Sequence, residues 1–459
     1  MDSRTLPLSA DGPRAGDHGG DRVAGLVLVF SGGAPRSQVI DLVAGRAELG
    51  RGDGDTFKLV DGRVSRRHAR IAFEAGRWLV ADLGSQNGTS VDGEPAIADT
   101  ERQAQRVIRV GDSLIVPCSD VRPFKQREVR VIDGFVRGPA MQAVLEEAAR
   151  AATSGRTLHI RGESGTGKEG VAQAFHRAGA RAARPMVAVN CAAIPHAIAE
   201  RLLFGAKRGT YSGAEADAPG YVQEADGSTL FLDEIAELDL QVQAKLLRLL
   251  ESHEVMPLGA SRPRKVDFAL CSATNKDLRA LVAAGMLRED LYFRIASPAV
   301  TVPALRNRPE EIPALIAHEL AALPRAPVAH VSLVEQCLLR PWPGNVRELL
   351  TEVRTAAHTA LASGHRVQAR HLAASAGSVF GAVPPGPRSA PPAGQPPPTP
   401  TPTATEELRK RLPGDAAERR LRIEEALRAN AGNVAATARA LGLHRTQLRR
   451  LLERLDDDE

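Results

Sequence analysis

The chain has 459 residues, of which 43% are hydrophobic, 25% are charged and only 3% are aromatic, and its formal net charge is +5. This length suggests about three domains of ordinary size, and the hydrophobic share is sufficient for folded cores. No apolar run approaches the roughly 18 residues that a membrane helix needs, and residues 1–22 contain no apolar secretory segment. The spacing of Cys118, Cys191, Cys271 and Cys337 fits neither a zinc site nor a disulfide framework. These features predict a soluble, cytoplasmic protein with free thiols.

Two segments of the chain differ in the spacing of their apolar residues. Within residues 23–122, short apolar runs alternate with turns rich in Gly and Asp, and the runs lie at 26–30, 69–73, 78–81 and 113–116. Short strands at this spacing predict an all-β sandwich. From residue 131 to residue 377 the pattern becomes strands alternating with amphipathic helices, which predicts an α/β domain with a parallel sheet.

The composition changes again toward the C-terminus. Residues 383–405 form a Pro-rich tract that cannot supply the backbone donors of a sheet, so we expect an extended, semi-rigid linker. The last residues are purely helical in pattern, which predicts an all-α domain. The expected segments are a disordered tail (1–22), the sandwich (23–122), the α/β domain (131–377), the linker (378–412) and the helical domain (413–459).

A glycine-rich loop in the α/β domain has the pattern of a phosphate-binding loop. Residues 157–160 read as a strand and residues 171–177 read as a helix. Glycines between a strand and a helix let backbone N–H groups surround the phosphates, and Lys168 can reach the β- and γ-phosphates. The residues expected to bind ATP are Gly162, Glu163, Ser164, Gly165, Thr166, Gly167, Lys168 and Glu169.

A second motif, which is acidic, also supports the binding and hydrolysis of ATP. Residues 229–232 form an apolar run that ends in Asp233 and Glu234. Carboxylates at the C-terminal end of a parallel strand lie beside the nucleotide. We therefore expect Asp233 to hold Mg²⁺, and Glu234 to orient and deprotonate the attacking water.

Four stretches of this region resemble the AAA+ domain of bacterial sigma-54-dependent activators, a P-loop ATPase domain with a helical lid. They are residues 162–169, 190–193, 227–234 and 342–349. The resemblance covers residues 131–377, and Glu169 at the place of the usual Ser or Thr is normal in that family. It implies an enzyme that couples ATP hydrolysis to remodelling of a protein complex.

The same resemblance implies roles for single residues. Asn190 resembles the switch that holds the catalytic Glu234, and Asn275 resembles the γ-phosphate sensor. Arg288 and Arg294 resemble arginine fingers that reach the ATP of a neighbouring subunit. Arg347 resembles the second sensor. Arginines that act in trans imply a homo-oligomeric ring, for which a hexamer is expected.

One loop resembles the segment that engages sigma-54 in this family, whose pattern is Gly-Ala-Phe-Thr-Gly-Ala. The corresponding residues are Gly209, Thr210, Tyr211, Ser212, Gly213 and Ala214. Tyr keeps the ring of Phe and adds a hydroxyl, Ser loses a methyl group of Thr, and Thr replaces Ala. We favour tolerated replacements, and the alternative is a motor that acts on another target.

Three motifs near the N-terminus resemble a forkhead-associated (FHA) domain, a β-sandwich whose loops bind phosphothreonine peptides. They lie at residues 49–51, 64–71 and 82–91. Arg51 can grip a phosphate with its planar fork, and Ser65 can donate a hydroxyl to it. Arg66 adds positive charge, and Asn87 suits a peptide backbone. The resemblance implies control by a phosphothreonine, on a partner or on this chain, that a Ser/Thr kinase writes.

Two further residues of these motifs have expected structural roles. His68 is expected to brace the FHA loops, and Gly88 is expected to permit a tight turn. Arg67 and Arg70 are interpreted as solvated surface charges.

The C-terminal helices at 416–429, 433–441 and 444–455 resemble a Fis-type helix-turn-helix domain. Gly442 ends the second helix, and Arg445, Thr446, Arg449 and Arg450 lie on or near the outward face of the third, which suits the major groove and flanking phosphates. The alternative is a small helical dimerisation unit with a basic rim.

Together, these features predict an ATP-dependent transcriptional activator. It would bind upstream, enhancer-like DNA sites and remodel the closed complex of the sigma-54 RNA polymerase holoenzyme under phosphothreonine control. Two alternatives remain: a phosphopeptide-controlled AAA+ remodelling ATPase that is not coupled to sigma-54, and a DNA-binding repressor with an idle ATPase.

Overall fold

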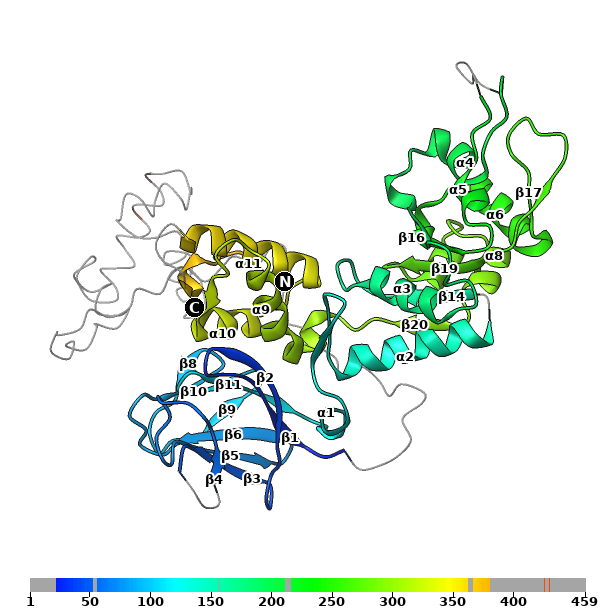
Figure 1. Cartoon of the computed structure of the whole chain (residues 1–459). Helices are drawn as coiled ribbons and strands as arrows, with labels where there is room; N and C mark the ends of the chain where they lie inside the picture. Colours follow the sequence, from blue (N-terminus) through cyan, green and yellow to red (C-terminus); the bar gives the residue numbers. More distant parts are fainter. Residues whose placement is uncertain are drawn as a thin grey trace. The chain divides into compact units, whose positions relative to one another are not determined.

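The computed structural model describes residues 22–52, 56–155, 157–210, 216–361 and 366–379, together with Glu425 and Ala429. The chain divides into two compact units, Met1–Pro384 and Pro385–Glu459. Most of the described residues belong to the first unit, whose elements are labelled in Figure 1. Among the described helices, none combines the length and the apolar character that crossing a membrane requires.

The N-terminal part of the first unit is a sandwich of two sheets, as its apolar runs predict. One sheet has the strand order β2-β1-β11-β10-β7-β8 and the other β4-β3-β5-β6-β9. Ile71, Val80 and Ile115 are fully buried in the apolar core of the sandwich. The strands are β1 (Gly25–Ser31), β2 (Ala34–Ile40), β3 (Arg46–Gly50), β4 (Thr56–Lys58), β5 (Ala69–Glu74), β6 (Arg77–Asp82), β7 (Thr89–Val91), β8 (Glu94–Pro95), β9 (Arg102–Ala104), β10 (Ile108–Val110) and β11 (Ser113–Cys118).

A short connection leads from the sandwich to the α/β domain. It consists of helix α1 (Arg122–Gln126) and the hairpin of β12 (Arg130–Ile132) and β13 (Phe135–Arg137). The ring of Phe135 lies so close to Gly167 that a Cβ there would stand 3.2 Å from it. The hairpin therefore packs against the phosphate-binding loop.

The α/β domain contains a parallel sheet with the strand order β15-β16-β19-β14-β20. Its strands are β14 (Thr157–Arg161), β15 (Val187–Asn190), β16 (Thr229–Asp233), β19 (Ala269–Thr274) and β20 (Ala299–Thr301). The expected strands at 157–160 and 229–232 are thus confirmed as β14 and β16. Because β14 and β16 both flank β19, the phosphate-binding loop and the acidic pair emerge at the same edge of the sheet.

Helices cover both faces of this sheet, and neighbouring residues of β16 point to opposite faces. Phe231 packs with Met141 and Phe175 of α2 and α3, whereas Leu230 and Leu232 belong to the cluster that holds α6 and α8. The helices are α2 (Pro139–Ser154), α3 (Lys168–Ala178), α4 (His196–Phe204), α5 (Tyr221–Glu224), α6 (Leu240–Ser252), α7 (Leu278–Ala283) and α8 (Glu289–Ile295), with 3-10 turns at Cys191–Ala193 and Ile235–Glu237.

A helical lid follows the sheet. Its helices α9 (Ile312–Ala321), α10 (Val331–Leu339) and α11 (Asn345–Leu361) lie beside one another in Figure 1. Leu333, Leu349 and Val353 are fully buried among them. Its smaller elements are the paired strands β21 (Val328–Ala329) and β22 (Arg366–Val367) and the 3-10 turns Leu305–Asn307, Pro309–Glu311 and Ala369–His371.

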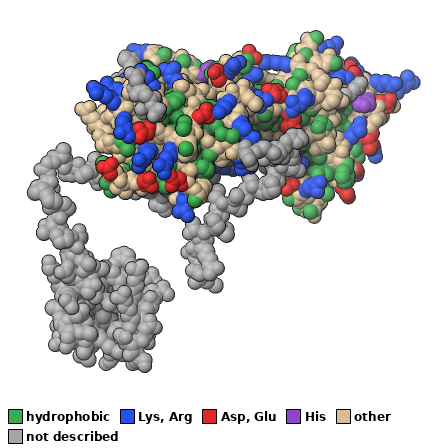
Figure 2. All heavy atoms as spheres, turned by 90° about the horizontal axis from the view of Figure 1, so that it is seen from below, with side chains coloured by type: hydrophobic (Ala, Val, Ile, Leu, Met, Phe, Trp, Pro, Cys, Tyr) green, Lys and Arg blue, Asp and Glu red, His purple; other side chains and the backbone are tan. Residues whose placement is uncertain are grey.

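The surface and the C-terminal region complete the description. In Figure 2, Lys and Arg side chains are interspersed with Asp and Glu on the face shown, in keeping with a net charge of only +5. In the second unit, Glu425 and Ala429 are helical and exposed. Residues 380–412 of the expected linker, and the other residues of the three C-terminal helices, lie outside the described residues.

Candidate functional site

The glycine-rich loop lines a cavity of about 460 Å³ between the sheet edge and the lid. The loop contributes the first residues of helix α3, whose unpaired N–H groups and dipole favour an anion. The lining also includes Asn190, Asp233, Glu234 and Arg347. The structure thus brings these four predicted site residues to the same cavity as the expected ATP-binding loop.

Lys168 begins helix α3 and turns its ammonium group back into the loop. Its Nζ atom donates to the carbonyl oxygens of Gly162 at 3.1 Å and Glu163 at 3.4 Å. It also lies 3.2 Å from Oε1 of Glu234. The side chains of Lys168 and Glu234 are only 7% and 16% exposed, so this ion pair is screened weakly by water.

The acidic pair ends strand β16. Burial raises the pKa of Asp233 above its usual range, while the nearby charge of Lys168 acts in the opposite direction. A half-buried carboxylate beside a phosphate cavity is the hard oxygen ligand that Mg²⁺ accepts together with phosphate oxygens, so Asp233 fits the metal-binding role. Glu234 has a left-handed backbone with φ of 51°, which turns its side chain away from the strand direction.

The carboxylate of Glu234 is held from the next strand. Its Oε2 atom accepts from the Thr274 hydroxyl and from the Asn275 backbone N–H, each at 3.2 Å. The side-chain oxygen of Asn190 accepts from the N–H of Ala192 at 3.0 Å. In this structure, Thr274 and Asn275 therefore position Glu234, and the expected switch contact from Asn190 stays a prediction.

The lid reaches the phosphate-binding loop through two residues with different surroundings. The guanidinium of the exposed Arg347 lies 3.4 Å from the Ser164 hydroxyl and lowers the pKa of Asp233 slightly, against the larger effect of burial. Asn345 is fully buried and donates to a Glu163 carboxylate oxygen at 3.1 Å and to the Ser164 carbonyl oxygen at 3.0 Å. Asn345 lies inside the motif at 342–349, but the motif alone did not indicate this contact.

A buried arginine near the lid also contacts the loop, and the sequence motifs did not predict this contact. Arg308 is 1% exposed, and it donates to the Thr166 carbonyl oxygen at 2.7 Å and to Glu311 at 2.6 Å. The Glu311 carboxylate in turn accepts from the N–H of Gly138 at 2.7 Å. This network connects the loop to the start of α2, and no motif in the sequence marks it.

The two expected arginine fingers lie at the start and near the end of helix α8. Arg288 is exposed and pairs with Asp290 at 2.7 Å, and Arg294 donates to the Leu250 carbonyl oxygen at 2.9 Å. Among the described residues, neither arginine belongs to the lining of the nucleotide cavity in its own chain. Phe293, between them, is 72% exposed. This surface is therefore exposed to solvent.

The segment expected to contact sigma-54 leaves the domain after α4. Gly209 and Thr210 are described, whereas Tyr211, Ser212, Gly213 and Ala214 lie outside the described residues. The N–H of Arg208 donates to Asp217 at 3.0 Å, which closes the base of this segment.

In the sandwich, backbone bonds gather the expected phosphopeptide loops. The N–H of Arg51 donates to the Ser65 carbonyl oxygen, and the N–H of Gly52 donates to that of Arg66, both at 3.0 Å. The amide nitrogen of Asn87 donates to the Arg63 carbonyl oxygen at 2.8 Å. Arg51, Arg66 and Asn87 are exposed. Backbone bonds therefore bring Arg51, Ser65 and Arg66 together. The fourth expected residue, Asn87, is held near them by its bond to Arg63.

His68 has the bracing role that its position predicts. It is fully buried, its Nδ1 atom accepts from the N–H of Ser65 at 3.0 Å, and its Nε2 atom lies 3.1 Å from the Gly88 carbonyl oxygen. Gly88 has φ of 75°, as the expected tight turn requires. The expected DNA-binding residues Arg445, Thr446, Arg449 and Arg450 lie outside the described residues.

Comparison with known families agrees with this division of the chain. Residues 135–301 match the sigma-54 interaction domain, residues 47–112 match the FHA domain, and residues 417–455 match the Fis family of bacterial regulatory proteins. The fold and the phosphate-binding site thus define a P-loop ATPase of the AAA+ class. The three matched domains, in this order, make the chain similar to sigma-54-dependent activators and add an FHA domain and a Fis-type helix-turn-helix region.

Individual proteins show the same relationship. The hydrogenase transcriptional regulatory protein HoxA of Bradyrhizobium diazoefficiens is 41% identical over 322 residues, which cover 69% of this chain and 63% of HoxA. The response regulator FleR of Pseudomonas aeruginosa is 46% identical over 223 residues, which cover 48% of this chain and 47% of FleR. A crystal structure of NtrX from Brucella abortus is 28% identical with a TM-score of 0.50, and the match covers 73% of this chain and 70% of that one. The chain thus spans about half to two thirds of the length of these relatives.

Proposed function

We propose that this chain is an ATP-dependent transcriptional activator that works as a homo-oligomeric, hexameric ring in the cytoplasm. Its C-terminal domain binds upstream DNA, and its AAA+ ring remodels the closed complex of sigma-54 RNA polymerase. The observation that carries the proposal is the meeting of Lys168, Asp233 and Glu234 at one cavity within a region that matches the sigma-54 interaction domain.

In the proposed ATPase reaction, backbone N–H groups of the loop at 162–169 bind the phosphates, and Lys168 neutralises the β- and γ-phosphate charge. Bound Mg²⁺, held by Asp233, would supply further charge neutralisation. Glu234 orients the attacking water and accepts its proton, while Thr274 and Asn275 keep the carboxylate in place. Asn275 is also the proposed γ-phosphate sensor, and Asn190 is the proposed switch.

The arginines complete the proposed site from two directions. Arg347, on the lid of the same chain, lies within reach of the loop and acts as the second sensor. Arg288 and Arg294 face outward on α8 and act as fingers toward the ATP of a neighbouring subunit. An isolated subunit is therefore expected to be nearly inactive, because its own fingers lie outside its nucleotide cavity.

The FHA domain is the proposed input of the activator. Arg51, Ser65 and Arg66 supply the donors and the positive charge that a phosphothreonine needs, and Asn87 contacts the peptide backbone. The phosphothreonine, produced by a Ser/Thr kinase, lies either on a partner or on this chain.

A single reconstituted assay tests the proposal. Purified full-length protein, ATP and sigma-54 holoenzyme are mixed on a promoter with a mapped upstream site, and open complexes and released phosphate are measured together. The proposal expects both signals, and it expects Glu234→Ala to lose both. Open complexes without ATP dependence would contradict it.

The segment at 209–214 departs from the family pattern Gly-Ala-Phe-Thr-Gly-Ala, and this departure favours one other candidate function. If ATP is hydrolysed but no open complex forms on any sigma-54 promoter, the chain is a phosphopeptide-controlled AAA+ remodeller of another target. If neither phosphate release nor open complexes appear while DNA still binds, the chain is a repressor with an idle ATPase.

A further inference from the structure

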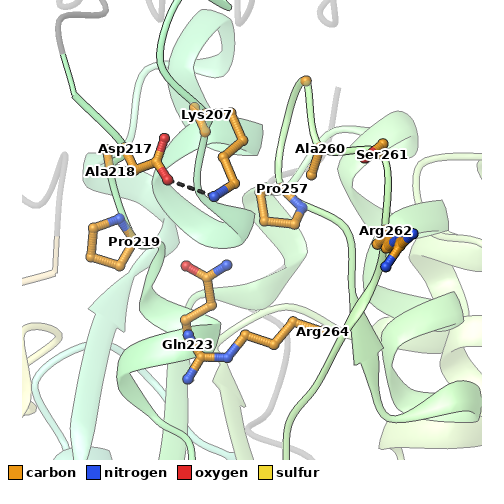
Figure 3. Close-up of a pocket in the computed structure, with 12 residues that line it drawn as sticks. Lys207, Asp217, Ala218, Pro219, Gln223, Pro257, Ala260, Ser261, Arg262 and Arg264 are labelled. Atoms are coloured by element: carbon orange, nitrogen blue, oxygen red, sulfur yellow. Dashed lines mark hydrogen bonds and ion pairs between the residues drawn. The ribbon is translucent and has the colours of Figure 1, made fainter.

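Two neighbouring segments project from the α/β domain and are joined at their bases. The first is described at residues 205–210 and 216–220, and the second lies between β17 (Glu254–Val255) and β18 (Arg264–Lys265). The N–H of Lys207 donates to the Leu258 carbonyl oxygen, and the N–H of Leu258 donates to that of Gly205, both at 2.9 Å. Figure 3 shows the cavity of about 580 Å³ at this junction, with Lys207, Asp217 and Pro257 around it.

Thr210 adds a side-chain contact to this junction. Its hydroxyl donates to the Lys207 carbonyl oxygen at 2.6 Å and lies 3.3 Å from the Leu258 carbonyl oxygen. Thr210 is half-buried, whereas the three residues before it are exposed. One hydroxyl therefore approaches carbonyl groups of both projecting segments.

The second segment is shaped to accept this hydroxyl. A Cβ on Gly259 would lie 2.5 Å from Oγ1 of Thr210, and Gly259 has φ of +71°. Any side chain at residue 259 would therefore displace the Thr210 hydroxyl from this position. The close approach depends on glycine on one side and on a small hydroxyl side chain on the other.

Alanine occupies the place of Thr210 in the pattern Gly-Ala-Phe-Thr-Gly-Ala, and alanine has no hydroxyl to donate. We infer that Thr210 is a positioning residue that latches the first projecting segment to the second at Leu258. The latch adds a side-chain contact to the backbone bonds that already join the two segments. This inference deepens the proposed function, since it concerns the segment proposed to engage sigma-54.

Another contact fastens the first segment only to itself. Lys207 pairs with Asp217 at 2.5 Å, and both side chains are about half exposed. The two side chains of this pair both belong to the first segment, so Asp217→Asn is a control that removes a contact within that segment and keeps the Thr210 hydroxyl.

The test compares Thr210→Val, which keeps the shape and removes the hydroxyl, with Thr210→Ser, which keeps the hydroxyl. Hydrogen–deuterium exchange is measured in the full-length protein on peptides that cover residues 205–210 and 256–260. Thr210→Val is expected to speed exchange in both peptides roughly 3- to 10-fold, the factor typical of one lost hydrogen bond, whereas Thr210→Ser exchanges like the unmodified protein. Asp217→Asn is expected to affect the first peptide alone.

Function is measured on the same proteins as open complexes formed per ATP hydrolysed. Thr210→Val is expected to lower this ratio, and Thr210→Ser to retain it. The inference is overturned if Thr210→Val leaves exchange at 256–260 unchanged. If the unmodified protein forms no open complexes, the proposed function fails, while the exchange experiment still decides whether the latch exists.

Discussion

Nζ of Lys168 and Oε1 of Glu234 lie 3.2 Å apart, so the cation expected to bind phosphate and the carboxylate expected to activate water are paired across one cavity. Thr274 and Asn275 hold the other carboxylate oxygen. Three contacts thus set the position of the Glu234 carboxylate.

Replacing Glu234 with Gln should separate ATP binding from hydrolysis. The amide keeps the shape and its hydrogen-bonding oxygen but cannot accept a proton from water, so turnover is expected to fall about 10²- to 10⁴-fold. ATP binding should be retained, because the loop and Lys168 are unchanged. Phosphate release and titration with a fluorescent ATP analogue measure the two effects. Glu237→Gln is the matched control, since Glu237 pairs with Lys276 outside the cavity. Equal turnover in both variants would exclude Glu234 as the base.

Arg51→Ala should strongly weaken phosphothreonine binding by the FHA domain. A lost charge-assisted contact to phosphate is expected to weaken binding about 10- to 100-fold. Arg67→Ala is the control, because Arg67 is an exposed arginine that pairs with Glu48 at 2.7 Å. Calorimetry with a Thr-phosphorylated peptide and its unphosphorylated form measures the effect. Binding of both peptides with the same affinity would show that the site does not read phosphate.

Mixing two inactive variants should restore ATPase activity if the site is shared between subunits. Arg288→Ala removes a finger, whereas Glu234→Gln removes the base. In a randomly mixed ring, roughly a quarter of the interfaces combine an intact Glu234 with an intact Arg288 from the neighbour. Each variant alone should remain inactive at any concentration. A mixture no more active than its components would argue against trans-acting fingers.

His159 should make the α/β domain less stable in mild acid. Burial lowers the pKa of His159 to about 4, and its Nδ1 atom lies 2.9 Å from the Ser272 hydroxyl. Because the folded pKa is below the usual value of 6.5, the unfolded chain binds the proton first as the pH falls. The stabilisation is therefore complete above pH 6.5 and is lost progressively toward pH 4.

Between pH 6.5 and 5 the expected loss is about 2 kcal/mol of unfolding free energy, visible as a falling melting temperature. His159→Asn should flatten this part of the curve. His196→Asn, at a side chain that is 75% exposed, should not change it. Identical slopes in all three proteins would assign the acid sensitivity to other groups.

Local patterns predicted the elements of the fold well. The strand at β16 and the helix at α3 were evident because a buried parallel strand is a continuous apolar run and an amphipathic helix repeats with its own period. The order of the strands in the sheet was not predicted. Strand periodicity alone does not say that β14 lies between β19 and β20.

The candidate site was predictable where one motif carries the chemistry, as in the loop around Lys168. It was not predictable where the contact depends on packing between distant segments. Asn345 meets Glu163, and Arg308 meets the Thr166 carbonyl, only because the lid folds back onto the loop. In the sequence, Thr210 is only a departure from the family pattern, and its contact with Leu258 is visible only in the folded structure.

The lid also packs directly against the backbone of the phosphate-binding loop, at Gly165 and Gly344. The N–H of Val346 donates to the Gly165 carbonyl oxygen at 3.0 Å, and a Cβ on Gly165 would lie 2.2 Å from the Gly344 carbonyl oxygen. The second glycine of the loop is therefore required by the lid as well as by the phosphates. Loop and lid are therefore matched to each other, and a chimera that takes its loop from one relative and its lid from another must keep glycine at residue 165.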